Sequence, residues 1–304
     1  MTPKPILTIL LLTMTVCAWA QYNPESDFTV VRSSDDRSIT ITGYTGTRQT
    51  VNIPPTIQGL HVIEIGANAF REKQLTSVII PISVTSIGTR AFRGNQLTSV
   101  TLPNNVTTIG NFAFAENSLT SVIIPNSVTS IGNNAFQGNQ LTSVTIGNSV
   151  TTIGALAFAA NKLTSVTIPN SVTTIVDRAF TENQLTGTIT IPGSVTSIGG
   201  WSFCCNPNLR AINVSSANPN YSSTDGVLYS KSGAALILWP GGKTGAVTIP
   251  AGATSIGKGA FCGNNLTSIY ISNNVTAIED GAFAGNRLTR ITLPANASIA
   301  DNAF

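Results

Sequence analysis

The stretch that decides the fold is LTSVIIPISVTSIGTRAFRGNQ, from Leu75 to Gln96. Its pattern recurs along most of the chain, mainly with a spacing of 22 residues, and a phenylalanine marks each recurrence. These phenylalanines are Phe70, Phe92, Phe114, Phe136, Phe158, Phe180, Phe203, Phe261, Phe283 and Phe304. Repetition at a fixed period of this length is typical of solenoids, in which each unit stacks on its neighbours and shares their core. The sequence therefore predicts a repeat solenoid.

The positions of the repeat can be interpreted one by one. Leu75, Val78 and Ile80 are interpreted as inward-facing residues of a short strand, with the residues between them, Thr76, Ser77 and Ile79, facing solvent. Pro81 has no N–H and ends that strand. Phe92 is expected to close the far side of the coil. Parallel strands are accordingly expected at 75–80, 97–102, 119–124, 141–146 and 163–168.

An asparagine also recurs once per coil. Asn95 returns as Asn117, Asn139, Asn161, Asn183 and Asn286. A stacked asparagine at a fixed turn can form hydrogen bonds with backbone groups that would otherwise be unpaired inside the solenoid. We therefore expect these side chains to be buried and bonded to the backbone.

The predicted fold is a mainly β repeat solenoid of about ten 22-residue coils over residues 49–304, with residues 21–48 forming an N-terminal segment. Only 10% of the residues are charged and 42% are hydrophobic, and many are β-branched, which favours short strands. Within the N-terminal segment, the runs FTVV and SITIT flank a polar stretch, which predicts a capping β-hairpin over 28–42. The 22-residue spacing is interrupted between Phe203 and Phe261, where we expect one irregular long coil (209–244) that contains a hairpin from Val227 to Trp239.

The first twenty residues have the features of a cleavable export signal. Lys4 precedes an apolar run from Ile6 to Val16, and Ala18-Trp19-Ala20 has small residues where a signal peptidase cuts. We expect cleavage after Ala20 and a secreted or cell-surface protein. A lipoprotein signal acylated at Cys17 is disfavoured, because the residue before that cysteine is a valine. No later segment reaches the roughly 18 apolar residues of a membrane span.

Charge and motifs argue against several functions. The formal charge of +3 falls by one, to +2, when Lys4 is removed with the signal, which is too small to indicate a nucleic-acid partner. The single histidine, His61, is expected at the surface, and no known catalytic or nucleotide-binding motif is found. No serine or threonine of the repeat has a neighbouring base that could activate it. We therefore expect no enzyme activity, no cofactor and no metal site.

Three cysteines follow the signal segment: Cys204, Cys205 and Cys262. Cys204 and Cys262 occupy the same repeat position, directly after a phenylalanine. A disulfide between them requires Cα atoms within about 7 Å, whereas coils stack about 4.8 Å apart, so one full coil between them would prevent it. The sequence favours buried free thiols and leaves the Cys204–Cys262 bridge as the alternative.

The pattern L-x-x-V-x-I-P-x-S-V-x-x-I-G-x-x-A-F-x-x-N resembles the BspA-like, Treponema-type leucine-rich repeats. The resemblance covers about residues 28–304, and Gly147 and Ser272 depart from it at the proline position. It implies a bacterial surface or secreted protein that contains leucine-rich repeats. Several members of the family are adhesins that bind host matrix proteins or other microbes.

The resemblance and the missing catalytic motifs favour a protein-binding solenoid, with host extracellular matrix or another cell surface as the partner. Most outward strand positions carry only threonine or serine. The exceptions at these positions gather late in the chain and include tyrosine and arginine, which dominate interface energetics. The predicted binding residues are Arg210, Asn213, Tyr270 and Arg290, with Tyr229 and Trp239 of the hairpin as one wall of the same patch.

Two alternatives remain from the sequence. In the first, the protein is an envelope scaffold that self-associates through an uncapped C-terminal end, where the strand Leu288 to Leu293 and Phe304 would lie open. In the second, Thr101, Thr145 and Thr167 bind an ordered surface such as ice or polysaccharide, although Tyr270 and two isoleucines interrupt that row.

Overall fold

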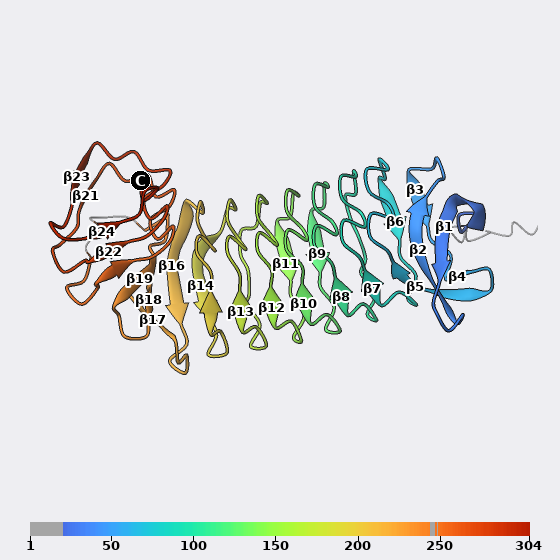
Figure 1. Ribbon diagram of the computed structural model, residues 1–304, viewed down its shortest axis with the longest axis horizontal. Coiled ribbons are helices and arrows are strands. Elements are labelled where there is room, and N and C mark those ends of the chain that lie inside the picture. The colour runs from blue at the N-terminus through green and yellow to red at the C-terminus, as the bar shows by residue number, and fades with distance from the viewer. Residues whose placement is uncertain (1–20, 244–246, 248) are drawn as a thin grey trace, which may run out of the picture.

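The computed structural model describes residues 21–243, 247 and 249–304, which form one elongated stack of coils (Figure 1). The stack is a β-solenoid of about 12 turns of roughly 22 residues. Among the described residues, the one helical element is a 3₁₀ turn, η1 (Glu25–Asp27). The expected export signal, residues 1–20, and Thr244, the last residue of the expected long coil, lie outside the described residues.

The N-terminal hairpin cap is confirmed. Strands β1 (Phe28–Arg32) and β2 (Ser38–Tyr44) pair antiparallel. Strand β2 then pairs in parallel with β5 (Leu60–Ile65), and β4 (Thr56–Ile57) pairs antiparallel with β5 on its other side. The ring of Tyr44 stacks on that of Phe70 at 5.5 Å between centroids, so the cap continues the aromatic row of the coils.

The longest sheet extends this cap along the stack through two-residue strands. These are β7 (Ser86–Ile87), β8 (Thr108–Ile109), β10 (Ser130–Ile131), β12 (Thr152–Ile153), β13 (Thr174–Ile175) and β15 (Ser197–Ile198). They pair in parallel with the isoleucines in register, for example Ile131 with Ile153. Each isoleucine points into the core, as the sequence predicted. The strand at this position was not foreseen.

The strands expected at the leucine-to-proline positions are only partly present. Two short parallel pairs form: β3 (Thr50–Asn52) with β6 (Ser77–Ile79), and β9 (Ser121–Ile123) with β11 (Ser143–Thr145). No strand forms at 97–102 or 163–168. Coil-to-coil bonds remain at these segments, for example 3.0 Å from the Ser118 N–H to the Leu97 carbonyl oxygen and 3.3 Å from the Thr120 N–H to the Thr98 carbonyl oxygen, but they do not continue into a strand.

The C-terminal coils build a second set of sheets. On the outward face, β14 (Thr186–Ile191) pairs in parallel with β16 (Asn208–Val214), and β21 (Ser268–Tyr270) pairs with β23 (Arg290–Thr292). The long coil contributes an antiparallel meander, β17 (Tyr221–Thr224), β18 (Val227–Ser230) and β19 (Ala235–Leu238). The β18–β19 hairpin is the predicted one, and β17 was not predicted. Strand β19 leads into the parallel strands β20 (Ser255–Ile256), β22 (Ala277–Ile278) and β24 (Ser298–Ile299).

A column of stacked aromatic rings runs through the core. Phe114, Phe136 and Phe158 are fully buried, and their centroids are 5.4 and 5.5 Å apart with nearly parallel planes. Trp239 takes the phenylalanine position of the long coil and stacks on Phe261 at 5.6 Å. Tyr44 and Trp239 thus add two coils to those marked by phenylalanine, which is why the stack exceeds the ten coils expected.

The recurrent asparagines are bonded to the backbone, as the sequence predicted, and all of them are buried except Asn286, which is partly exposed. The Asn95 amide group donates to the carbonyl oxygens of Phe70 (2.8 Å) and Phe92 (2.9 Å), and its Oδ1 accepts the N–H of Leu75 (2.9 Å). Each asparagine therefore ties two consecutive coils together. Asn206, which the altered spacing hid, does the same for the coil of Phe203.

We expect Phe136→Ala to lower the free energy of unfolding by about 3–5 kcal/mol, because it removes a buried ring from the stack and leaves a cavity. The measurement is thermal or denaturant unfolding. Phe112→Ala is the matched control, since Phe112 lies on the turn and is partly exposed. An equal loss in both variants would show that the stack is not the stabilising feature.

We expect Asn139→Ala to cost about 2 kcal/mol in unfolding experiments. The change leaves the buried Leu119 N–H without its acceptor, and it removes one of two donors from each of the Phe114 and Phe136 carbonyl groups, which Asn117 and Asn161 still bind. Asn111→Ala removes a comparable coil-to-coil bond at an exposed position, to the Asn133 N–H, and should cost less than about 1 kcal/mol.

Candidate functional site

The long coil separates the central coils from the C-terminal coils more on one side of the stack than on the other. On the sheet side, the meander β17–β19 places three strands where other coils place one. On the opposite, turn side, the Trp201 N–H donates directly to the Lys258 carbonyl oxygen at 3.3 Å, so the coils on either side of the insertion meet. The coils after the insertion consequently turn away from the line of the central stack (Figure 1).

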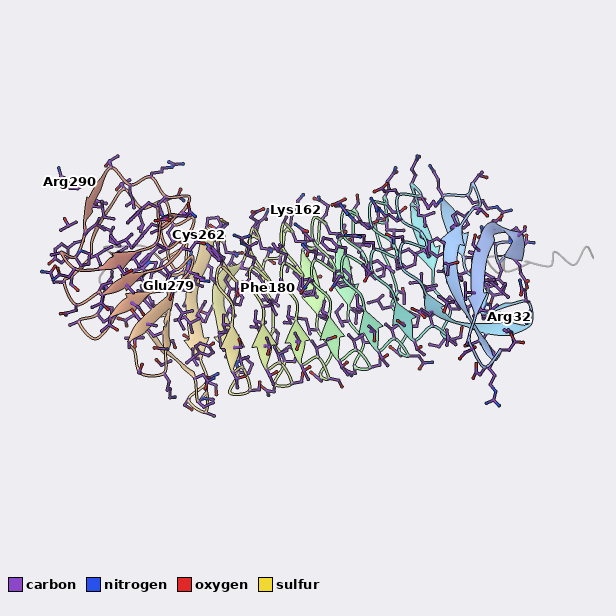
Figure 2. The ribbon with its side chains drawn as sticks, in the orientation of Figure 1. Arg32, Lys162, Phe180, Cys262, Glu279 and Arg290 are labelled. Carbon is purple, nitrogen blue, oxygen red and sulfur yellow. A yellow bond between two sulfur atoms is a disulfide. The ribbon has the colours of Figure 1, made fainter. Side chains whose placement is uncertain are left out.

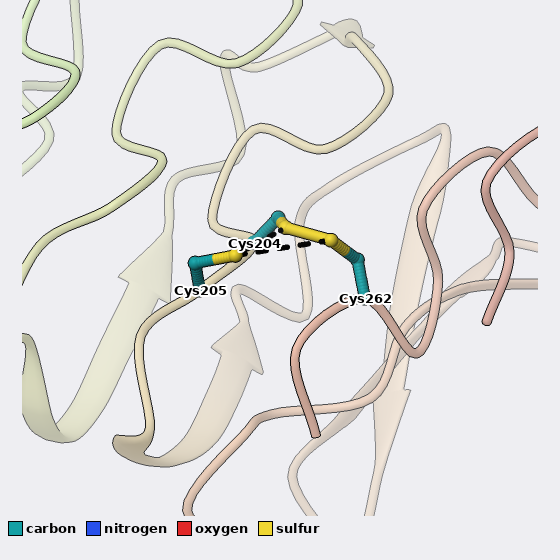
Figure 3. A group of neighbouring side chains, drawn as sticks. All are labelled: Cys204, Cys205 and Cys262. Atoms are coloured by element: carbon teal, nitrogen blue, oxygen red, sulfur yellow. Dashed lines mark hydrogen bonds between the residues drawn. A yellow bond between two sulfur atoms is a disulfide. The ribbon is translucent and has the colours of Figure 1, made fainter. Parts of the chain in front are cut away.

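A disulfide joins the two sides of the split, and the favoured expectation of free thiols was wrong. Cys204 is bonded to Cys262, with Cα atoms 5.5 Å apart (Figure 3). The sequence argument favoured free thiols because a full coil between the two residues would hold them too far apart. The coil instead widens on the sheet side and leaves the cysteine positions adjacent, so the geometric limit is met.

The third cysteine, Cys205, is a half-buried free thiol. Its sulfur lies 3.1 Å from that of Cys204 and 3.9 Å from that of Cys262. Burial raises the pKa of the Cys205 thiol, and the charge of Glu182 raises it further. Because the thiolate is the species that attacks disulfides, the thiol is held in its unreactive form beside the bridge. Of the three neighbouring sulfur atoms, those of Cys204 and Cys262 form the disulfide, and that of Cys205 is the free thiol.

A polar groove lies close to the disulfide, because Pro207 and Asn264 of its lining follow Cys204 and Cys262 closely in the sequence. It has a volume of about 1140 Å³. The lining residues are Thr186, Gly187, Pro207, Asn208, Arg210, Gly241, Gly242, Lys243, Asn264 and Asn265. They come from three places that the split brings together: the β14–β16 pair, the end of the long coil and the turn before β21. We call this hollow the split groove.

A smaller hollow of about 420 Å³ adjoins the split groove and shares Lys243, Asn264 and Asn265 with it. Its far end is lined by Ser268 and Tyr270 of β21. Tyr270 is 66% exposed, so its ring is available to a partner.

Four of the six predicted binding residues are exposed on the outward face. Arg210 and Asn213 lie on β16, Tyr270 on β21 and Arg290 on β23, where it pairs with Ser268. Figure 2 shows Arg290 directed outward, while Phe180 lies inside the coils. Arg210 and Tyr270 line the connected hollows, and Asn213 and Arg290 do not.

The expected aromatic wall is not on the surface. Tyr229 is 4% exposed and Trp239 is 6% exposed, and both belong to the C-terminal core. Burial raises the pKa of the Tyr229 hydroxyl, and the charge of Asp225 raises it further. The two rings are covered because the meander continues into the sheet of the C-terminal coils.

Sequence reasoning missed Lys243, Asn264 and Asn265. Lys243 follows Gly241 and Gly242 at the point where the long coil rejoins the repeat. The feature of the sequence that could have indicated this site is a pair of glycines followed by a lysine at the end of the irregular segment. Its meaning depends on which coils the split places opposite each other, which the linear pattern does not specify.

Within the described part of the chain, no helix is long and apolar enough to cross a bilayer.

The fold and its recurrent residues define a leucine-rich-repeat β-solenoid. The sequence matches the BspA-type leucine-rich repeat region, in six copies, over residues 63–186, 152–225 and 243–304. The chain therefore belongs to the BspA-type leucine-rich repeat family. Proteins with this fold and family are typically non-enzymatic. No match to a curated protein is found.

Solved structures with the same architecture come from several bacteria. A leucine-rich cell surface protein from Faecalibacterium prausnitzii is 27% identical, with a TM-score of 0.70, over 93% of this chain and 86% of that one. The pneumococcal vaccine antigen PcpA is 21% identical, with a TM-score of 0.62, over 88% and 71%. A leucine-rich repeat protein from Eubacterium ventriosum is 23% identical, with a TM-score of 0.53, over 90% and 84%. The last two likenesses are in fold alone.

We expect reduction of the Cys204–Cys262 bridge to lower the free energy of unfolding by about 2–4 kcal/mol, because the bridge closes a loop with a sequence separation of 58. The measurement is thermal unfolding of the double variant Cys204→Ser with Cys262→Ser. Cys205→Ser is the control and should leave the midpoint nearly unchanged. A double variant as stable as the parent would show that the bridge does not constrain the chain.

Proposed function

We propose that the protein is an exported, surface-exposed solenoid that binds a protein ligand, and that it acts as an adhesin toward host matrix proteins or other cells. BspA-like leucine-rich repeat surface proteins are typically found at the cell surface or secreted, which supports this location together with the signal pattern of residues 1–20. The similar structure from Faecalibacterium prausnitzii is described as a cell surface protein. Binding, not catalysis, is then the expected activity.

The observation that carries the proposal is the change in chemistry along the outward face. Most positions of the regular coils present threonine and serine there, which offer hydrogen bonds but little buried area, and Ile79 and Ile123 are the exposed apolar exceptions. Beyond the split, Tyr270 and Arg290 are exposed on adjacent paired strands, with Arg210 across the groove. Tyrosine and arginine are enriched among the residues that contribute most to binding free energy at protein interfaces. The face around β21 and β23 is therefore the proposed contact surface.

The test is a binding screen of the mature chain against matrix proteins and partner cells, followed by two paired variants. Tyr270→Ala with Arg290→Ala should weaken binding by more than about 2 kcal/mol, because both side chains are large and exposed. Thr145→Ala with Thr167→Ala alters exposed residues of two regular coils and should change binding by less than about 0.5 kcal/mol. The reverse ranking would place the site on the regular coils and contradict the proposal.

A further inference from the structure

We propose that the split groove binds an acidic, carboxylate-bearing peptide segment of the partner. This inference rests on the proposed function, because it names the chemistry of a ligand for the same face. It starts from the shape of the groove, whose floor is backbone. A Cβ on Gly241 would lie 2.8 Å from the Asn206 carbonyl oxygen, and one on Gly242 would lie 2.6 Å from the Asn208 carbonyl carbon. Only glycine lets the long coil lie this close, so this part of the groove lining carries no side chain.

The two charged groups on the groove are both cations. Lys243 is held in place, because its Nζ donates to the Asp225 carbonyl oxygen at 2.7 Å and lies 5.6 Å from the centroid of the Trp239 ring. One carbonyl uses one of the three N–H donors of an ammonium group, which leaves donors for a ligand. Arg210 lies at the irregularity in the β14–β16 register, where a bulge redirects the side chain.

No carboxylate among the described residues lines the groove or its adjoining hollow. The ion pairs among the described residues are all in the N-terminal half: Arg32 with Asp36, Arg71 with Glu72, and Arg93 with Glu116. The charges of Asp225 and Glu182 act on Tyr229 and Cys205, outside the lining. The groove therefore presents positive charge that the described protein does not neutralise, and it suits an anionic ligand.

The remaining lining favours a peptide over an anionic polysaccharide. Asn208, Asn264 and Asn265 contribute side-chain amides, which can both donate to and accept from a peptide backbone. The Asn264 amide group is fixed by its bond to the Trp239 carbonyl oxygen at 3.0 Å. Arginine also matches the planar carboxylate with two parallel hydrogen bonds. A sulfated polysaccharide would need a longer row of cations than the two found here.

The experiment measures fluorescence polarisation of fluorescein-labelled decaglutamate with the mature chain, and decaglutamine serves as the neutral probe. We expect the acidic probe to bind and its affinity to fall as NaCl rises, because exposed charges are screened by salt. Arg210→Gln with Lys243→Gln should weaken binding at least tenfold, whereas Arg210→Lys with Lys243→Arg should retain most of it. The matched control is Arg37→Gln with Lys73→Gln, which removes the same charge from exposed N-terminal positions and should change affinity less than twofold.

Several outcomes would overturn the inference. Equal binding of decaglutamine, or an equal loss in the control variant, would show that the groove does not select carboxylates. A heparin oligosaccharide that binds more tightly through Arg210 and Lys243 would assign the groove to polysaccharide. Thermal unfolding of each variant shows whether it is folded. If a matrix protein needs Tyr270 and Arg290 but not Arg210 and Lys243, the proposed function stands and this inference fails. If decaglutamate binds through Arg210 and Lys243 but no matrix protein or cell binds, the groove selects carboxylates and the proposed adhesin function fails.

Discussion

The buried asparagine is the constraint on which the stack depends. In each regular coil from Phe92 to Phe180 its oxygen accepts an N–H from the preceding coil and its amide group donates to carbonyl groups of that coil and its own, so consecutive coils must keep a common length at this point. An unpaired backbone group in a dry core costs about as much as a lost hydrogen bond. Insertions are therefore excluded from the asparagine turn. The parallel rings of Phe114 and Phe136 follow from this register, because identical residues fall above one another.

The long coil shows what happens when extra residues enter where this constraint does not act. Asn206 keeps its ladder bonds, and Trp239 keeps the aromatic position. The added residues are accommodated between these two points, as the meander β17–β19. The Tyr221 hydroxyl accepts the N–H of Ile198 at 2.8 Å, at the strand that ends the long sheet. The meander widens the stack on the sheet side, while the coils of Trp201 and Lys258 stay in contact on the turn side, so the walls of the split groove stand apart. The Cys204–Cys262 disulfide holds the two groups of coils in this arrangement.

The core residues of the regular coils could be predicted from the sequence, their strands could be predicted only in part, and the site could not. In a solenoid each coil contacts mainly its neighbours, so a period in the sequence is a period in space. The inward residues, the asparagine ladder and the cap follow from that rule. It fails where the period fails, and so the Cys204–Cys262 bridge and the burial of Tyr229 depend on how the meander packs. Left-handed turn positions were also hidden, because Arg90, Phe112 and Leu156 occupy them in place of glycine.

The same reasoning explains why a repeat protein would acquire its specificity at an irregular coil. A perfect repeat offers the same groups every 22 residues, so a ligand shifted by one coil would bind almost equally well. The split groove occurs at one place in the described chain, with one arginine and one lysine facing it. It lies next to the exposed side chains of Tyr270 on β21 and Arg290 on β23. A ligand that contacts both regions has a single register on the stack, and its position along the solenoid is then defined.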